Sequence, residues 1–258
     1  MNKHHLLSVS LVVCAGFCGA RSISPQTKPT TAPATAIQVP FVGCASDGMG
    51  GPVKAPDGPS VTVVIPAVAA QRLAYYKVDG DLGALAPRGW HCFSVYGSNG
   101  ADLFISPDPI EAKVFFSMGW KGFSGQVIQI SFVNGGASGR FEVAKVIARV
   151  FPAYKQFAQD VIAEGIEPAS GFPSGPYPHD KLTYRAKNVV EFETPANTAG
   201  LGTDSRLRPN ASQIDGVAII TGADTDLVLL SARLLQKDRD LIQFIVQQVE
   251  RDSQTKAQ

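Results

Sequence analysis

The chain has 258 residues, of which 45% are hydrophobic and 17% are charged, a composition that supports a folded core and excludes an intrinsically disordered protein. Its 23 basic and 22 acidic residues give a formal net charge of +1, which excludes a general nucleic-acid binder because neutralising phosphates requires a basic excess. The 25 Gly and 18 Pro residues predict long loops between helices and strands.

Residues 1–20 have the pattern of an export signal peptide. Lys3 supplies the basic start, residues 6–17 form an apolar run, and a small-residue exit ends at Ala20. A membrane-spanning helix needs roughly 20 apolar residues, so this shorter run predicts cleavage after Ala20 rather than a permanent anchor. We therefore expect a periplasmic or secreted protein with no transmembrane span in the mature chain.

A lipid anchor is the alternative to simple cleavage. Cys14 or Cys18 would then carry the acyl chains that hold the protein at a membrane. The enzyme that processes lipoproteins requires a small residue before the cysteine, whereas Val13 and Phe17 occupy those positions. The lipid anchor therefore fits the sequence less well.

The rest of the chain divides into a linker, one domain and a tail. Residues 21–38 are mainly Ser, Thr, Pro and Ala, a composition typical of a flexible linker. Residues 39–252 are expected to form a single α+β globular domain, and residues 253–258 a disordered tail.

Two cysteines remain in the predicted domain, Cys44 and Cys92. An even pair in an oxidising compartment predicts one disulfide, which would contribute about 4 kcal/mol in the chain-entropy model. The alternative is a reactive thiol at Cys92 helped by His91. Neighbouring side chains of a strand point to opposite faces, so these two residues do not form a direct catalytic pair.

The first half of the domain is predicted to be rich in strands. A helix is expected to begin at Pro66 and to run to residue 77, because Pro is tolerated at the first helical position. An Asn-Gly pair ends the segment 97–100 and predicts a hairpin there. The apolar, β-branched runs predict strands at 39–44, 61–65, 90–96, 101–106 and 126–133.

Two helices are expected next, at about 138–150 and 153–164, with Ser138 capping the first. Apolar residues of the first helix recur at spacings of three and four and form a core stripe: Val143, Val146, Ile147 and Val150. Its polar residues form a solvent-facing stripe: Glu142, Lys145 and Arg149.

The second half ends in two hairpins and a helix. Strands are predicted at 181–186, 188–194, 216–221 and 226–234, and a last helix is predicted to begin near Asp238. Strands that group in hairpins and helices that group in a pair predict the α+β class. We expect a largely antiparallel sheet, a central helix pair and a C-terminal helix.

The segment NGGASGR, residues 134–140, is the clearest local pattern for a binding site. Glycines before a helix, exposed amides at the helix start and the charge of Arg140 together predict an anion site. The spacing fits neither GxGxxG nor GxxxxGK[ST]. The alternative is a plain turn with a surface arginine.

Two long loops carry the other candidate binding residues. Loops of this length are uncommon in a compact domain unless they bind something or lack order. Their aromatic and basic side chains suit a glycan, an anionic polymer or another small ligand, and the alternative is that the loops are merely solvated. The candidates are Tyr177 and His179 in residues 165–180, and Arg206 and Arg208 in residues 195–213.

A hydrolase would need a serine that meets a base in space. Ser117, Ser124 or Ser138 could meet His179 and Asp180, yet the chain has no GxSxG, SxxK or Cys/His motif. We therefore name no catalytic residue. No metal and no cofactor are expected, because the two histidines of the predicted domain stand alone and its cysteines are expected to be oxidised.

Three stretches of the domain are distinctive: VGCASDGMGGP, LAPRGWHCFSVYGSNGADLFISPDPI and SGRFEVAKVIARVFP. They resemble a group of exported bacterial proteins without an assigned function, and the resemblance extends over most of the chain after residue 20. It implies a cell-envelope location and carries over no catalytic residues. A bacterial source also implies that Asn210-Ala211-Ser212 is not a glycosylation site.

The sequence as a whole predicts an exported, non-enzymatic domain of the bacterial cell envelope. Its partner would be a small ligand, a glycan or an envelope protein, bound through the long loops. The alternatives are a hydrolase that acts on cell-envelope material and a stabilising subunit of a larger envelope complex.

Overall fold

The computed structural model describes residues 34–256, which belong to one compact unit. It has 25% helix and 36% strand, with mostly antiparallel sheets and a C-terminal helix, so the predicted α+β class is confirmed. The predicted signal peptide at 1–20 and most of the predicted linker lie outside the described residues.

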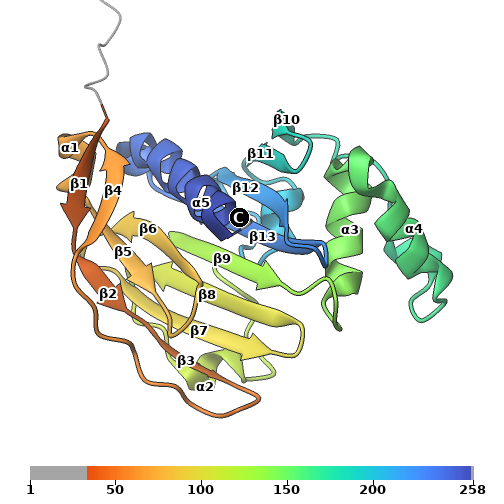
Figure 1. Cartoon of the computed structure of the whole chain (residues 1–258), viewed down its shortest axis with the longest axis horizontal. Coiled ribbons are helices and arrows are strands. Elements are labelled where there is room, and N and C mark those ends of the chain that lie inside the picture. Colours follow the sequence, from red (N-terminus) through yellow and green to blue (C-terminus); the bar gives the residue numbers. More distant parts are fainter. Residues whose placement is uncertain (1–33, 257–258) are drawn as a thin grey trace, which may run out of the picture. The chain divides into compact units, whose positions relative to one another are not determined.

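An eight-stranded sheet lies at the centre of the unit (Figure 1). Its neighbouring strands are antiparallel, except for β3 and β7, which run parallel. In spatial order the strands are β10 (Lys181–Ala186), β11 (Val189–Thr194), β12 (Ile214–Thr221), β13 (Asp226–Arg233), β9 (Val127–Val133), β8 (Gly100–Ser106), β7 (His91–Gly97) and β3 (Ala45–Gly48).

The hairpin predicted at residues 97–100 joins β7 to β8. Gly100 has φ 138°, a backbone conformation that L side chains rarely adopt. A Cβ at this position would lie 1.9 Å from the carbonyl oxygen of Phe132 on β9. The hairpin therefore needs glycine both for its turn and for the close approach of the next strand.

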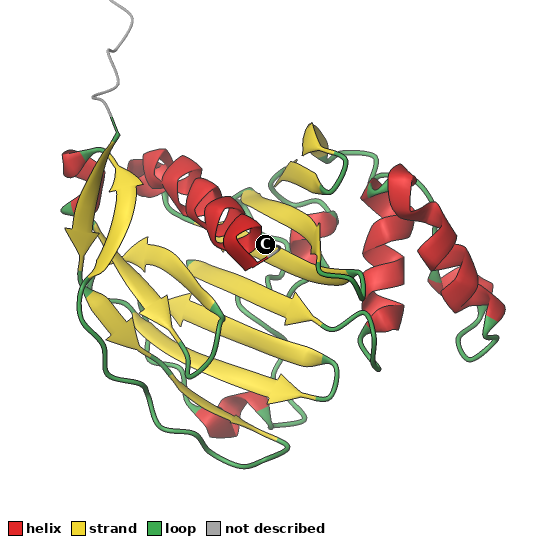
Figure 2. Ribbon diagram, in the orientation of Figure 1, coloured by secondary structure: helices red, strands yellow, loops and turns green. Residues whose placement is uncertain are grey.

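Alternation along the strands gives the sheet two buried faces. On β13, Val228 and Leu230 pack into one core, whereas Leu227 and Leu229 pack into the other. The first face is covered by α5 and by two small sheets, as Figures 1 and 2 show. These elements are α5 (Ile242–Lys256), β2 (Phe41–Gly43), β5 (Leu73–Lys77) and β6 (Gly83–Pro87), with the pair β1 (Thr35–Val39) and β4 (Val61–Ile65).

The second face is covered by the predicted helix pair, α3 (Arg140–Val150) and α4 (Lys155–Ala163). All four residues of the predicted core stripe on α3 are buried: Val143, Val146, Ile147 and Val150. The unit also contains short helices: α1 (Ala67–Ala70), α2 (Ala112–Phe115) and the 3-10 turns η1 (Pro152–Tyr154), η2 (Ala169–Gly171) and η3 (Leu201–Thr203). A further 3-10 helix, η4 (Gln236–Leu241), leads into α5.

The helix predicted at 66–77 is wrong over most of its length. Only α1 is helical, and Leu73–Lys77 forms strand β5, which pairs with β2 and with β6. Tyr76 is fully buried, and its hydroxyl donates to the carbonyl of Pro87 over 2.8 Å. Pairing with a strand on each side of β5 overrides the local helical pattern. The helix was predicted because nothing in the sequence indicated the partner strand β6.

The domain extends beyond both predicted boundaries. Strand β1 begins at Thr35 and pairs with β4, so residues 35–38 of the predicted linker belong to the folded unit. At the other end α5 continues to Lys256, into the predicted tail, and Ser253 is buried. Pairing with β4 and the packing of Ile37 against the core account for the first difference, and the packing of α5 accounts for the second.

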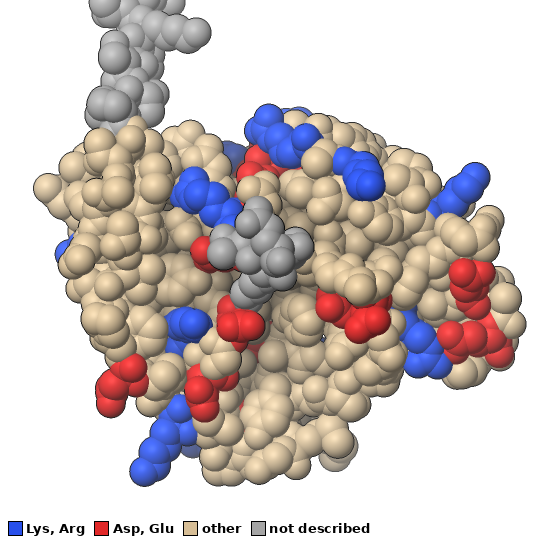
Figure 3. All heavy atoms as spheres, viewed as in Figure 1, with Lys and Arg blue, Asp and Glu red and all other residues tan. Residues whose placement is uncertain are grey.

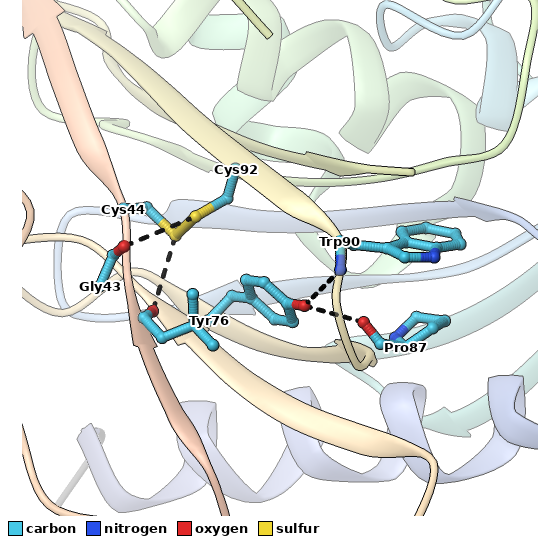
Figure 4. Close-up of a disulfide and its surroundings, with 7 residues drawn as sticks. Gly43, Cys44, Tyr76, Pro87, Trp90 and Cys92 are labelled. Carbon is cyan, nitrogen blue, oxygen red and sulfur yellow. Dashed lines mark hydrogen bonds between the residues drawn. A yellow bond between two sulfur atoms is a disulfide. The ribbon is translucent and has the colours of Figure 1, made fainter. Parts of the chain in front are cut away.

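The predicted disulfide is present between Cys44 and Cys92, whose Cα atoms are 5.4 Å apart (Figure 4). Cys44 lies between β2 and β3, where the chain passes from the three-stranded sheet to the large sheet. Its backbone amide donates to the carbonyl of Lys77 over 2.8 Å. The bridge therefore fixes the three-stranded sheet to β7 of the large sheet.

Candidate functional site

A cavity with a volume of about 550 Å³ lies on the sheet face that α3 covers. Strands β8, β9 and β13 form its floor, α3 forms one wall, and the loops after α4 and after β11 form the rest. Cavities that hold small ligands are typically of this size and combine an apolar lining with a few polar groups.

Strand alternation produces the polar floor. On β9, Gln129 and Ser131 face the cavity, whereas the neighbouring Ile130 faces the opposite core. Asp102 of β8 is the register partner of Ser131. Ser131 Oγ donates to Asp102 Oδ1 over 2.5 Å, and Gln129 Nε2 donates to the same oxygen over 3.2 Å. The carboxylate of Asp102 is thus held in one orientation.

The second oxygen of Asp102, Oδ2, receives no hydrogen bond from the part of the chain that the structure describes. Burial raises the pKa of Asp102, while the hydrogen bonds from Ser131 and Gln129 and the charge of Arg206 act to lower it. The floor therefore presents a carboxylate whose charged form lacks the solvation it would have at the surface.

The solvent-facing stripe predicted on α3 lines the cavity wall. Glu142 accepts a hydrogen bond from Asn99 over 3.3 Å, and Lys145 forms an ion pair of 2.8 Å with Glu167. The guanidinium of Arg149 lies 4.1 Å from the ring centroid of Tyr177. The wall thus offers both signs of charge to the cavity.

The two long loops meet across the cavity. Tyr177 and Arg206, one predicted from each loop, both line it. The Tyr177 hydroxyl donates to Asp204 Oδ1 over 2.6 Å, and the backbone amide of Arg206 donates to Gln129 Oε1 over 2.7 Å. The side chain of Arg206 forms no ion pair within residues 34–256, and its guanidinium lies 6.0 Å from the ring centroid of Trp120.

The other three predicted binding residues lie outside this cavity. His179 and Arg208 are exposed. Arg140 forms an ion pair with Glu164, with 2.6 Å between its Nη2 and Glu164 Oε2. The chain's own carboxylate therefore occupies the position that an anion was predicted to take at Arg140.

The glycine segment before α3 also has internal acceptors. The amide of Gly135 donates to Asp226 Oδ1, and the amide of Gly136 donates to Asn134 Oδ1, each over 2.9 Å. These hydrogen bonds fix the turn, and the two amides already donate to acceptors within the chain rather than to a bound anion.

The residues considered for hydrolysis each form hydrogen bonds with a different part of the chain. Ser138 Oγ lies 3.0 Å from Ser98 Oγ, and Ser117 Oγ donates to the carbonyl of Val114. Asp180 accepts from Thr194 Oγ1 and from the amide of Leu201, each over 2.7 Å. None of the hydrogen bonds found in the described chain joins these groups to His179.

Sequence reasoning did not single out Asp102, Gln129 or Ser131. A signal for two of them was present, because Gln129 and Ser131 are polar residues at alternate positions of an otherwise apolar strand. Asp102 had no such signal, since its place opposite Ser131 depends on the register of β8 against β9.

The described chain offers no metal site and no membrane-spanning helix. In residues 34–256, no cluster of His, Cys, Asp and Glu is arranged to hold a metal ion. None of the helices in that range combines the length and the apolar composition needed to cross a bilayer. Comparisons with protein-family models, with curated proteins and with solved structures found no match.

Proposed function

We propose that this chain is an exported bacterial cell-envelope protein whose α+β domain binds a small ligand in the cavity between α3 and the large sheet. The disulfide between Cys44 and Cys92 supports export, because such bonds form in oxidising compartments. The signal-peptide pattern at 1–20 and the resemblance to exported bacterial proteins support the same location.

The convergence of the two long loops carries the proposal for binding. Tyr177 and Arg206 come from loops on either side of β10 and β11, and both line the cavity whose floor contains Asp102. Loops that are held in place over a rigid sheet are common positions for ligand-binding residues. The contacts of Tyr177 with Asp204, and of the Arg206 amide with Gln129, hold these loops in place.

The charge distribution supports a small ligand rather than a nucleic acid. On the face shown in Figure 3, basic and acidic side chains are interspersed, with uncharged surface between them. The whole chain has a formal net charge of only +1. A surface that binds nucleic acid would instead concentrate basic residues.

Native mass spectrometry of the protein purified from its own periplasm tests this proposal. We expect the wild-type protein to retain a small molecule that Arg206→Ala loses. Arg208→Ala is the matched control, because Arg208 lies in the same loop, is exposed and does not line the cavity. Equal retention by all three proteins, or no retained molecule in any, would contradict the proposal.

The export part of the proposal has a separate test. Cell fractionation and the intact mass of the mature protein should show a periplasmic or secreted chain that begins after Ala20 and has Cys44 joined to Cys92. An N-terminus at Cys14 or Cys18 with acyl chains would indicate a lipoprotein instead, and a cytoplasmic chain that keeps Met1 would contradict export.

A further inference from the structure

We propose that the ligand of this cavity carries an α-amino-acid head, with its ammonium group at Asp102, its carboxylate at Arg206 and an aliphatic body over the apolar part of the floor. This inference rests on the proposed function, since it names the ligand class of the same cavity. It follows from the partial burial of Asp102, from the lack of an ion pair at Arg206 within residues 34–256, and from the two cavities that both residues line.

The cavity holds equal numbers of acidic and basic residues. The acidic residues are Asp102, Glu142 and Asp204, and the basic residues are Lys145, Arg149 and Arg206. A strongly anionic ligand would meet repulsion from the first set, and a strongly cationic ligand from the second. This composition favours a ligand that carries one charge of each sign.

Most of these charges already have partners. Asp204 accepts from Tyr177, Lys145 pairs with Glu167, and Arg149 donates to the carbonyl of Gly175 over 3.2 Å. Arg206 forms no ion pair within the described chain. Among the three acids, Asp102 is half-buried whereas Glu142 and Asp204 are exposed, so the charged form of Asp102 gains most from a cationic group of a ligand.

Asp102 and Arg206 are near each other without forming an ion pair. Both residues line the main cavity and the smaller cavity beside it, which places the two groups in the same part of the site. An α-amino acid carries its ammonium and carboxylate on the same carbon and can bridge such a pair. A guanidinium binds a carboxylate through two parallel hydrogen bonds, and a carboxylate accepts from an ammonium in a short, charge-assisted contact.

The remaining lining suits an aliphatic body better than a sugar. Val133, Val146, Leu227 and Leu229 form the apolar part of the lining. The aromatic residue of this cavity is Tyr177, and the guanidinium of Arg149 lies over its ring. A sugar would stack on an open aromatic face, and this ring already has a cation on one side.

The site has room for a second residue. A smaller cavity of about 190 Å³ continues past the β7–β8 hairpin. It shares Asp102, Arg206 and Glu142 with the main cavity. The proposed head therefore lies where the two cavities meet, and a dipeptide could extend from one into the other.

Isothermal titration calorimetry with four probes tests the inference: leucine, leucyl-leucine, isoamylamine and isocaproic acid. The last two are leucine without its carboxylate and without its ammonium group. We expect leucine or leucyl-leucine to bind and the two single-charge analogues to bind at least about 10-fold more weakly, because each lacks one charge-assisted contact. Binding of either analogue as tightly as leucine would overturn the inference.

Three variants locate the two contacts. Asp102→Asn and Arg206→Ala should each weaken leucine binding about 10-fold or more, whereas Arg208→Ala should leave it unchanged. Circular dichroism of each variant checks that it is folded. Unchanged affinity in folded Asp102→Asn would overturn the assignment of the ammonium group.

The inference and the proposed function can fail separately. If no probe binds while the wild-type protein still carries a periplasmic molecule that Arg206→Ala loses, the amino-acid head is wrong and the ligand-binding function stands. If no probe binds and no molecule is retained, both proposals are wrong.

Discussion

The hydroxyl of Tyr177 donates a hydrogen bond of 2.6 Å to Asp204 Oδ1 and so joins the loop after α4 to the loop after β11. Burial and the neighbouring Asp204 raise the pKa of Tyr177 to about 12, while Arg149 acts to lower it. The neutral phenol is therefore the form that the folded protein favours, and its hydrogen bond joins two of the loops that line the cavity.

Tyr177→Phe should loosen the two loops without disturbing the core. We expect a loss of about 1 kcal/mol in the free energy of unfolding and weaker retention of the ligand, because one hydrogen bond between the loops is removed. The folded pKa of about 12 lies above the value of about 10 for an unfolded tyrosine, so the contribution of Tyr177 is complete below pH 10 and is lost as the pH rises toward 12.

Alkaline unfolding curves measure this effect directly. The wild-type protein should lose stability between about pH 10 and pH 12 more steeply than Tyr177→Phe, and ultraviolet titration should show one fewer late-titrating tyrosine in the variant. Tyr184→Phe serves as the control, because Tyr184 is exposed on the edge strand β10. Identical curves for wild type and Tyr177→Phe would contradict the role of the hydrogen bond.

Reduction of the Cys44–Cys92 disulfide should destabilise the domain by about 4 kcal/mol in the chain-entropy model. Urea unfolding with and without reductant measures the difference. The double variant Cys44→Ala/Cys92→Ala should unfold at the same urea concentration in both conditions, since it has no bond to reduce. A wild-type protein whose unfolding is insensitive to reductant, with its free thiols shown to appear, would contradict this estimate.

Local patterns in the sequence predicted the elements that depend on local interactions. The spacing of Val143, Val146, Ile147 and Val150 predicted the buried face of α3. The Asn-Gly pair at residues 99–100 predicted the β7–β8 hairpin, and the two cysteines of the domain predicted the disulfide. Each of these depends on a few neighbouring residues or on one pair.

Elements that depend on distant partners were not predicted. Tyr75 and Tyr76 belong to β5 because β2 and β6 pair on its two sides, and the local pattern favoured a helix. Similarly, loop length pointed to Tyr177 and Arg206, whereas Asp102 lines the cavity only because of the register of β8 against β9. Arg140 had the expected charge, yet Glu164 of the following helix end neutralises it.

Arg233 is a buried cation without an acidic partner in the described chain. It is 2% exposed, burial lowers its pKa, and its guanidinium donates to the carbonyls of Phe123, Gly125 and Arg208. These contacts tie the segment before β9 to the loop that carries Arg206. Arg233→Met should therefore cost about 1–3 kcal/mol of stability, because the carbonyls lose their donor.

The same variant should weaken the ligand contact that we propose for Arg206, since its loop loses an anchor. Urea unfolding gives the stability change, and the fluorescence of Trp120, which lies next to Phe123 with 5.3 Å between ring centroids, reports the local loosening. Arg208→Met is the control, because it keeps the backbone carbonyl that Arg233 contacts. A stability equal to that of the wild type would show that relief of the buried charge offsets the lost hydrogen bonds.

Asp102 should lower stability at neutral pH. Burial raises its folded pKa above the value of about 3.9 expected for the unfolded chain, so the folded protein binds this proton more tightly. Stability linked to Asp102 is then complete below about pH 3.9 and is lost as the pH rises through the folded pKa. Asp102→Asn removes this titration and keeps the shape of the side chain.

We therefore expect Asp102→Asn to be more stable than the wild type by about 1 kcal/mol at pH 7 and nearly equal to it at pH 4. Thermal unfolding at a series of pH values measures the difference. Ser131→Ala provides the comparison, because it removes a donor to the carboxylate and should destabilise the protein most where Asp102 is ionised. A difference between Asp102→Asn and wild type that grows as the pH falls would have the wrong sign and would contradict a raised pKa. A variant that is both more stable and unable to bind would identify Asp102 as a residue whose charge serves the ligand rather than the fold.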